Sequence, residues 1–252
     1  ACDVNEPLLS RGLSGDGRLS FANLSLGPQH LQPLAKNFEH MRLSTLNLEN
    51  CLRLSSSRAV RSTLAQIARC GTLVSLNLSD NKLRFDDAVG DGLAAIVEGC
   101  PRLSTLRLRC CRLTATTLYH MALSLWNAKT GVAAGGEGGG NAADAGLARL
   151  LASTTPSPMD LRLLDLRDNR LSNRGMEYLA AIISSALSRL EQVFLDDNKI
   201  TARGVAFVRD AFCAEERRND SLQRLTLAMN PLHGGGDALA EILSRCAGLT
   251  DL

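Results

Sequence analysis

The chain has 252 residues, of which 45% are hydrophobic but only 4% aromatic, and its formal net charge is +2. A charge so close to neutral offers no general attraction for nucleic acid or for an anionic membrane surface. No stretch approaches the roughly eighteen uninterrupted apolar residues of a transmembrane helix, so the sequence predicts neither nucleic acid nor membrane as a partner.

The first twenty residues are polar and glycine-rich. They lack the basic-then-apolar order of a secretory signal peptide, and we expect an irregular lead-in or a weak cap over 1–20. A single domain of about seven repeated units is predicted to fill 21–252. Its first unit is degenerate and short, running 22 residues from Phe21 to Leu43 (43 − 21 = 22).

The repeated unit is clearest over Leu161 to Leu171, LRLLDLRDNRL, where leucines occupy positions one, four, six and eleven and Asn169 occupies position nine. Leu164 and Leu166 alternate with polar residues, which predicts a short strand with its apolar side chains on one face. The Asn169 amide is expected to bond backbone groups left unpaired where the strand ends. The spacing recurs from first positions 43, 73, 103, 161, 190 and 222, so the steps are 30, 30, 58, 29 and 32.

Between these strands, apolar residues recur at the spacing of a helix with one buried face. Val60, Leu64 and Ile67 form such a face within 58–69. The segments 86–98 and 114–127 show the same pattern. Each unit is therefore predicted to pair one strand with one helix.

In the later units a glycine lies four residues before an apolar helix position, which lets the start of the helix approach its neighbour closely. These glycines are Gly175, Gly204 and Gly235, and Thr117 stands at the equivalent place in an earlier unit. The G-x-x-x-L-A pattern with a period near 29 resembles the ribonuclease-inhibitor-like class of leucine-rich repeat proteins, over roughly residues 43–252. The resemblance implies an α/β leucine-rich repeat solenoid, a curved horseshoe with a parallel β-sheet on its concave face and helices on its convex face.

One unit is about twice as long as the others because it carries an insertion near 128–160. Residues 129–141 are of low complexity and predict a flexible loop, and 142–153 has the pattern of an additional helix. One interpretation is a tolerated surface insertion, and the other is an arm that docks a partner. Residues 249–252 begin another repeat, so we expect the C-terminal end of the domain to be truncated or continued.

The eight cysteines follow the repeat rather than a disulfide pattern. Two occupy position nine and three lie three residues before the first leucine of the next unit, which predicts small buried fillers. They are Cys51 and Cys111, and Cys70, Cys100 and Cys246, respectively. Cys110 and Cys111 should point to opposite faces. We therefore expect reduced cysteines and an intracellular, cytoplasmic protein.

The polar positions of the strands predict the concave surface, because equivalent positions of adjacent strands lie about 4.8 Å apart. Arg107 should meet Asp165, and Arg167 should meet Asp196. One interpretation is that these pairs only neutralise each other on a solvated sheet, worth about 0–1 kcal/mol each. The other is a mixed-charge protein-binding patch around an exposed Phe194. The candidate partner-binding residues are Arg107, Arg109, Asp165, Arg167, Phe194 and Asp196.

No catalytic arrangement stands out in the sequence. The four histidines share no position in the repeat, and no P-loop, zinc-protease or nucleophile-elbow motif is found, so we expect no enzyme activity, cofactor or metal site. The sequence favours a non-catalytic protein–protein interaction or scaffold module that binds one or more proteins in a larger intracellular assembly. A cytoskeletal or ciliary complex is the preferred setting. The alternative is a regulator of an enzyme, such as a small-GTPase activator or an enzyme inhibitor.

Overall fold

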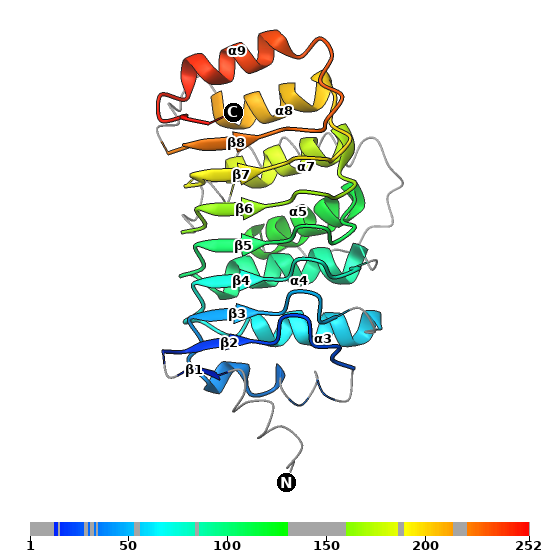
Figure 1. The fold of residues 1–252 in the computed structure, drawn as a ribbon, viewed down its shortest axis with the longest axis vertical. Coiled ribbons are helices and arrows are strands. Elements are labelled where there is room, and N and C mark those ends of the chain that lie inside the picture. The colour runs from blue at the N-terminus through cyan, green and yellow to red at the C-terminus, as the bar shows by residue number, and fades with distance from the viewer. Residues whose placement is uncertain are drawn as a thin grey trace.

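The computed structural model describes residues 13–14, 16–27, 30, 33, 35–52, 56–83, 86–130, 160–185, 189–213 and 221–251. Short strands alternate with helices along this part of the chain (Figure 1). The strands are β1 Leu13–Ser14, β2 Arg18–Ser20, β3 Thr45–Asn47, β4 Ser75–Asn77, β5 Thr105–Arg107, β6 Leu163–Asp165, β7 Gln192–Phe194 and β8 Arg224–Thr226. The helices are the 3-10 helix η1 Phe38–His40 and the α-helices α3 Ser57–Ile67, α4 Asp86–Gly99, α5 Ala115–Thr130, α7 Ser172–Ser185, α8 Ala202–Cys213 and α9 Gly236–Arg245.

Strands β1 to β8 form one sheet in sequence order, parallel from β2 to β8. Equivalent positions of successive units are paired, so Leu76 aligns with Leu106 and Leu106 with Leu164. These three leucines are at most 4% exposed, because they face the helices that cover one side of the sheet (Figure 1). A helix is about 10 Å wide whereas strands are about 4.8 Å apart, so stacking places the sheet on the concave side. The predicted leucine-rich repeat solenoid is confirmed.

The start of the chain is more regular than expected. Strand β1 pairs antiparallel with β2, and β2 pairs in parallel with β3, so residues 13–14 and 18–20 belong to the sheet instead of an irregular lead-in. Leu19 aligns with Leu46, which makes the first unit 27 residues long (46 − 19 = 27) rather than 22. The prediction started the unit at Phe21 because a polar, glycine-rich sequence hides the single buried leucine of β2.

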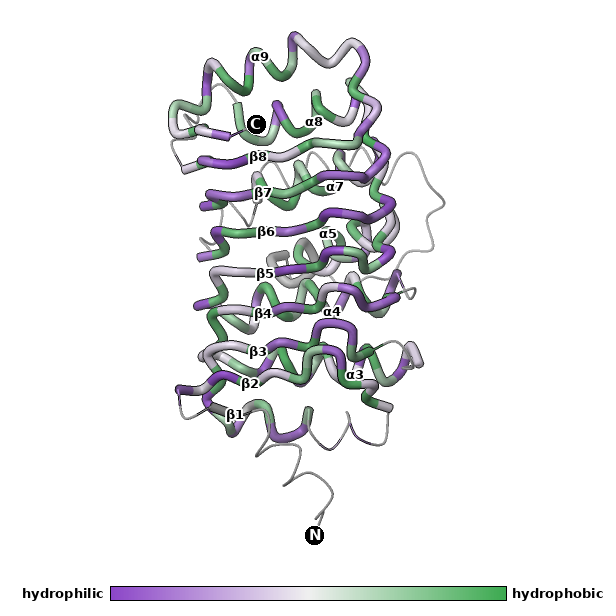
Figure 2. The backbone as a smooth tube through the Cα atoms, in the orientation of Figure 1, coloured by the Kyte–Doolittle hydropathy of each residue, from purple (hydrophilic) through white to green (hydrophobic). Residues whose placement is uncertain are grey.

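The space between sheet and helices holds one aliphatic core that runs from Leu19 to Cys246. In Figure 2, hydrophobic residues recur on the strands and helices, whereas the turns after β4, β6 and β7 are hydrophilic. The five cysteines placed by the period are at most 2% exposed, as predicted. Cys110 is exposed and Cys111 is buried, so the adjacent pair does point to opposite faces. Burial raises the pKa of the Cys100 thiol to about 12.

The turns after β4, β6, β7 and β8 are stabilised by the asparagine at position nine, as predicted. Asn169 donates hydrogen bonds to the carbonyls of Leu108 at 2.9 Å and Leu166 at 2.8 Å. Its amide oxygen accepts from the backbone N–H groups of Cys111 and Leu113. One buried amide thereby joins two units through groups that the strands leave unpaired.

The residues at position eight adopt a left-handed backbone conformation in the same turns, with φ between 50° and 59°. They are Asn50, Asp80, Cys110, Asp168, Asp197 and Met229. Asn and Asp tolerate this conformation better than most residues, which explains why four of the six are Asn or Asp.

The close approach expected at the helix starts is present. A Cβ added at Gly204 would lie 2.7 Å from Asn173 Oδ1, and one at Gly235 would lie 3.4 Å from Ala202 Cα, in each case an atom of the preceding unit. Thr117 replaces the glycine in α5 and is fully buried, and its hydroxyl donates to the Asp86 carboxylate at the start of α4. Adjacent units are thus joined by glycine contact in one place and by a hydrogen bond in another.

The predicted insertion coincides only in part with the described residues. Helix α5 extends to Thr130, so Lys129 and Thr130 continue the helix and do not begin the expected flexible loop. Residues 131–159, including the expected extra helix over 142–153, lie outside the described residues. Among the helices that the structure describes, none has the length and apolar character needed to cross a membrane.

Candidate functional site

The candidate site lies on the open face of the sheet, across β5, β6 and β7. Arg107, Asp165 and Phe194 are Cα partners in the strand register and form one lateral row. Arg109, Arg167 and Asp196 lie two residues beyond the ends of the same strands. The expectation that Arg107 lies beside Asp165 is therefore confirmed for the backbone.

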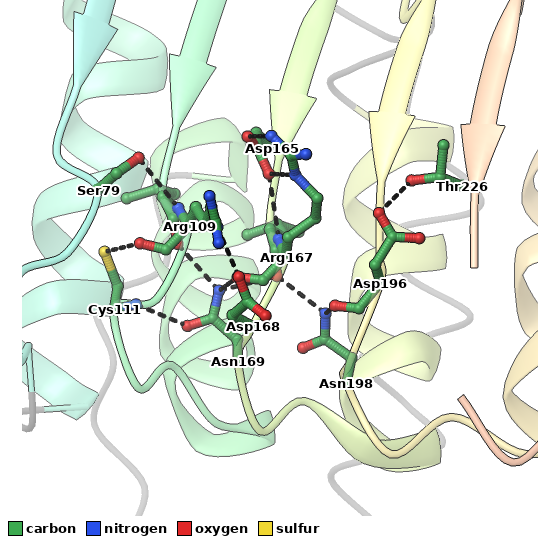
Figure 3. Close-up of polar contacts among 12 residues, drawn as sticks. Ser79, Arg109, Cys111, Asp165, Arg167, Asp168, Asn169, Asp196, Asn198 and Thr226 are labelled. Atoms are coloured by element: carbon green, nitrogen blue, oxygen red, sulfur yellow. Dashed lines mark hydrogen bonds and ion pairs between the residues drawn. The ribbon is translucent and has the colours of Figure 1, made fainter. Parts of the chain in front are cut away.

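The Asp165 side chain, however, does not bond Arg107. Arg167 Nε donates to Asp165 Oδ1 at 2.9 Å and Arg167 Nη2 to Oδ2 at 2.6 Å (Figure 3). Asp165 is only 3% exposed, so the predicted solvated carboxylate is in fact buried. The two residues lie on the same face of one strand, and the long arginine side chain folds back over its neighbour to form a two-pronged contact. This hydrogen bond raises the pKa of Arg167.

Phe194 is half-buried rather than exposed, because Arg167 covers it. The guanidinium carbon of Arg167 lies 5.0 Å from the centre of the Phe194 ring, within the range of a cation–π contact. Asp165, Arg167 and Phe194 therefore form one connected unit, which we call the arginine anchor.

Asp196 is engaged by the next strand instead of by Arg167. The Thr226 hydroxyl donates to Asp196 Oδ2 at 2.7 Å (Figure 3). The Ala228 N–H donates to Asp196 Oδ1, also at 2.7 Å. The expected Arg167–Asp196 ion pair is thus replaced by hydrogen bonds to β8 and the turn after it. Asp196 also borders an apolar hollow of about 520 Å³ whose lining includes Leu227 and Leu239.

Arg109 forms an ion pair that the sequence did not predict. Its Nε lies 2.5 Å from Asp168 Oδ2 in the neighbouring unit (Figure 3). Asp168 occupies the left-handed position eight, and this turn directs its carboxylate back toward β5. The hydrogen bond to Asp168 raises the pKa of Arg109. The sequence does place Asp168 directly before the turn asparagine. The left-handed backbone conformation of Asp168, which brings its carboxylate to Arg109, could not be derived from the spacing of residues.

Arg107 is the exposed member of the central row. Within the described residues its side chain has no ion pair, hydrogen bond or ring contact. Asn77, its neighbour in β4, donates instead to Glu49 Oε2 at 3.0 Å. The residues on both sides of Arg107 are thus engaged elsewhere.

The described residues contain no group of three or more His, Cys, Asp or Glu side chains that could hold a metal ion. The geometry of the six predicted residues instead provides fixed charges, one ring and one unengaged guanidinium. Such an arrangement can bind a surface of complementary charge, and it has no pair of groups positioned for proton transfer.

Comparison with known proteins also identifies leucine-rich repeats in this chain. A family model described as "Leucine Rich repeat" matches residues 157–180, the unit that contains β6 and the start of α7. A ribonuclease inhibitor of Sus scrofa is 32% identical, with 80% of this chain and 48% of the relative covered. The chain thus spans about half the length of that curated relative.

Two solved structures also match. An internalin of Listeria monocytogenes has a TM-score of 0.36 and 12% identity, covering 92% of this chain and 65% of that one. A TLR13–ssRNA13 complex has a TM-score of 0.35 and 15% identity, covering 81% of this chain and 20% of that one.

Proposed function

The chain is a leucine-rich repeat protein of the ribonuclease-inhibitor-like class, a fold that supports protein–protein interaction in general, and from this premise we propose that its concave face docks a protein partner. The docking site consists of Arg107, Arg109, Asp165, Arg167, Phe194 and Asp196. In this role the module works by binding and performs no catalysis.

The observation that carries the proposal is the arginine anchor. The buried Asp165 carboxylate fixes both prongs of the Arg167 guanidinium, and the Phe194 ring supports it from one side. Arginine and aromatic side chains are enriched among the residues that dominate binding energy at interfaces. A side chain already fixed before binding also loses less conformational entropy on association. A partner would therefore meet a preformed contact in the middle of the sheet.

Inhibition of an enzyme is a second candidate, favoured by the 32% identity to a ribonuclease inhibitor. In that case the bound partner is an enzyme whose active site the concave face covers. Addition of the purified chain to a pancreatic-type ribonuclease should then slow cleavage of a fluorogenic RNA at stoichiometric concentration. Unchanged cleavage at a tenfold molar excess would remove ribonuclease as the target and leave the docking proposal intact.

The proposed setting is a multi-protein assembly in the cytoplasm, in which the module acts as a scaffold. A cytoskeletal or ciliary complex is the first location to test. Fluorescent tagging of the natural full-length protein should give a signal on filaments or cilia, and size-exclusion of native extract should place it in a large complex. A uniform signal together with elution as a free monomer would contradict this setting.

The docking site itself is tested by site-specific photocrosslinking. A photoreactive amino acid at Thr105, on β5 beside the site, should capture a discrete set of proteins from native extract. The same group at Ser62, exposed on α3 of the convex face, is the matched control. We expect the Thr105 products to disappear when Arg167 and Phe194 are both replaced by Ala. Capture from Ser62 alone would contradict a concave docking site.

A further inference from the structure

We infer that the partner on the concave face presents a pair of acidic side chains, at alternate positions of an extended segment, to Arg107 and Arg109. This inference rests on the proposed function and specifies the chemistry of its partner. It follows from which charges of the site are already satisfied within the chain and which are open.

The nearest carboxylates are unavailable to Arg107. Both oxygens of Asp165 bond Arg167, and the Asp165 side chain is only 4% exposed. On the other side, the Asn77 amide bonds Glu49. Arg107 is exposed, and its guanidinium bonds nothing within the described part of the chain. A guanidinium prefers a carboxylate that it can bind with two prongs.

Arg109 is engaged, but by a contact that a partner can displace. Its ion pair with Asp168 is solvent-accessible, with side-chain exposures of 52% and 34%. Exposed ion pairs contribute only about 0–1 kcal/mol, so a desolvated carboxylate from a partner can compete for the guanidinium.

The spacing of the two arginines fixes the spacing of the acids. Arg107 is the last residue of β5 and Arg109 lies two residues beyond it, where the N–H groups of Leu108 and Cys110 still bond the next unit. Leu106 and Leu108 are buried whereas both arginines are exposed, so the two arginines lie on the same face, about 6.6 Å apart for an extended backbone. An extended segment has the same repeat, so acidic residues separated by one residue match both arginines. The expected partner motif is Asp/Glu-x-Asp/Glu, in a strand-like segment that lies along β5.

The surrounding charges disfavour a polyanion such as RNA. Asp80 lies close enough to raise the pKa of Arg109, and Asp168 and Asp196 lie on the next two units. A continuous row of phosphates would meet these carboxylates, whereas two discrete acidic side chains avoid them. The site is therefore suited to a short acidic protein segment.

The test is selection of an unbiased phage-displayed peptide library on the wild-type chain, followed by affinity measurement with the enriched peptides. We expect acidic residues at alternate positions, and about tenfold weaker binding when either is changed to Gln. Arg107→Glu should lose these peptides and select basic ones, and Arg107→Gln should lose them without inversion. Arg58→Glu, the same charge change on the exposed convex face of α3, should leave the selection unchanged.

Two outcomes overturn the inference and are distinguishable. Peptides that depend on Phe194 but carry no acidic pair, or preferred binding of single-stranded RNA at the same residues, would refute the acidic motif. The first of these results leaves the proposed docking site standing. Peptides whose binding is indifferent to every concave variant would refute both the inference and the proposed function.

Discussion

The two sides of the sheet use their side chains in opposite ways. On the covered side the units repeat nearly the same leucines, with an asparagine or cysteine at position nine and helices in close contact, and most of these groups are buried. On the open side, equivalent positions carry Asn77, Arg107, Asp165 and Phe194 in turn, and their contacts differ from unit to unit. The covered side therefore determines stability, and the open side is free to determine binding.

Alkaline pH should produce the largest loss of unfolding free energy, through the buried thiols of the covered side. Burial raises the pKa of Cys51 to about 11 and of Cys100 and Cys246 to about 12, and it also raises that of Cys111. In the unfolded chain these thiols ionise near their ordinary pKa of 9.0. Between that pH and the raised pKa of the folded chain, the unfolded state binds fewer protons, so stability falls as pH rises. At pH 10 each thiol contributes a loss of about 1 kcal/mol, or about 4 kcal/mol together.

Urea unfolding at pH 8 and pH 10 under reducing conditions measures this loss. Cys100→Ala should reduce the difference between the two pH values, because one buried thiol is removed. Cys110→Ala, at the exposed neighbour of Cys111, should reduce it less. Equal differences in all three proteins would show that buried thiols do not govern the alkaline limit.

The close contact between α4 and α5 should be highly sensitive to substitution. A Cβ at Gly90 would lie 2.5 Å from both His120 Cβ and the Thr117 carbonyl oxygen. Because one of these atoms belongs to the backbone, Gly90→Ala should force the helices apart and cost about 3 kcal/mol of unfolding free energy. Gly71→Ala is the control, since an added Cβ there meets nothing within 4 Å. A loss at Gly90 no larger than at Gly71 would argue against close packing of these helices.

The contrast between the two sides of the sheet also explains which features of the structure could be predicted from the sequence. Leu164, Asn169 and Gly204 were predictable because each satisfies a local rule that every unit repeats. The hydrogen-bond partners of Asp165 and Asp196 were not predictable, because a side chain on the open face has several possible partners at similar distances. Strand β2 was missed for a different reason. It pairs with β1 in a hairpin and carries one buried leucine, but its sequence lacks the full repeat motif.

Asp165 joins the two sides, because it is a buried residue of the open face. Asp165→Asn keeps the shape and removes the charge that fixes Arg167, and we expect a loss of about 1–2 kcal/mol in unfolding free energy. Asp168→Asn removes the carboxylate of the exposed ion pair with Arg109 and should cost less than about 0.5 kcal/mol. Chemical denaturation of both variants gives the comparison. Equal costs would mean that the burial of Asp165 does not strengthen its contact with Arg167.

Arg107 should give the smallest change in stability of all. Within the described residues its side chain bonds nothing, so Arg107→Ala removes no contact and should alter the unfolding free energy by less than about 0.5 kcal/mol. Arg167→Ala leaves the buried Asp165 carboxylate without its partner and should cost clearly more. Thermal unfolding of the two variants separates these cases. If Arg107→Ala were as costly as Arg167→Ala, the guanidinium of Arg107 would be occupied within the chain, and it would not be open to a partner.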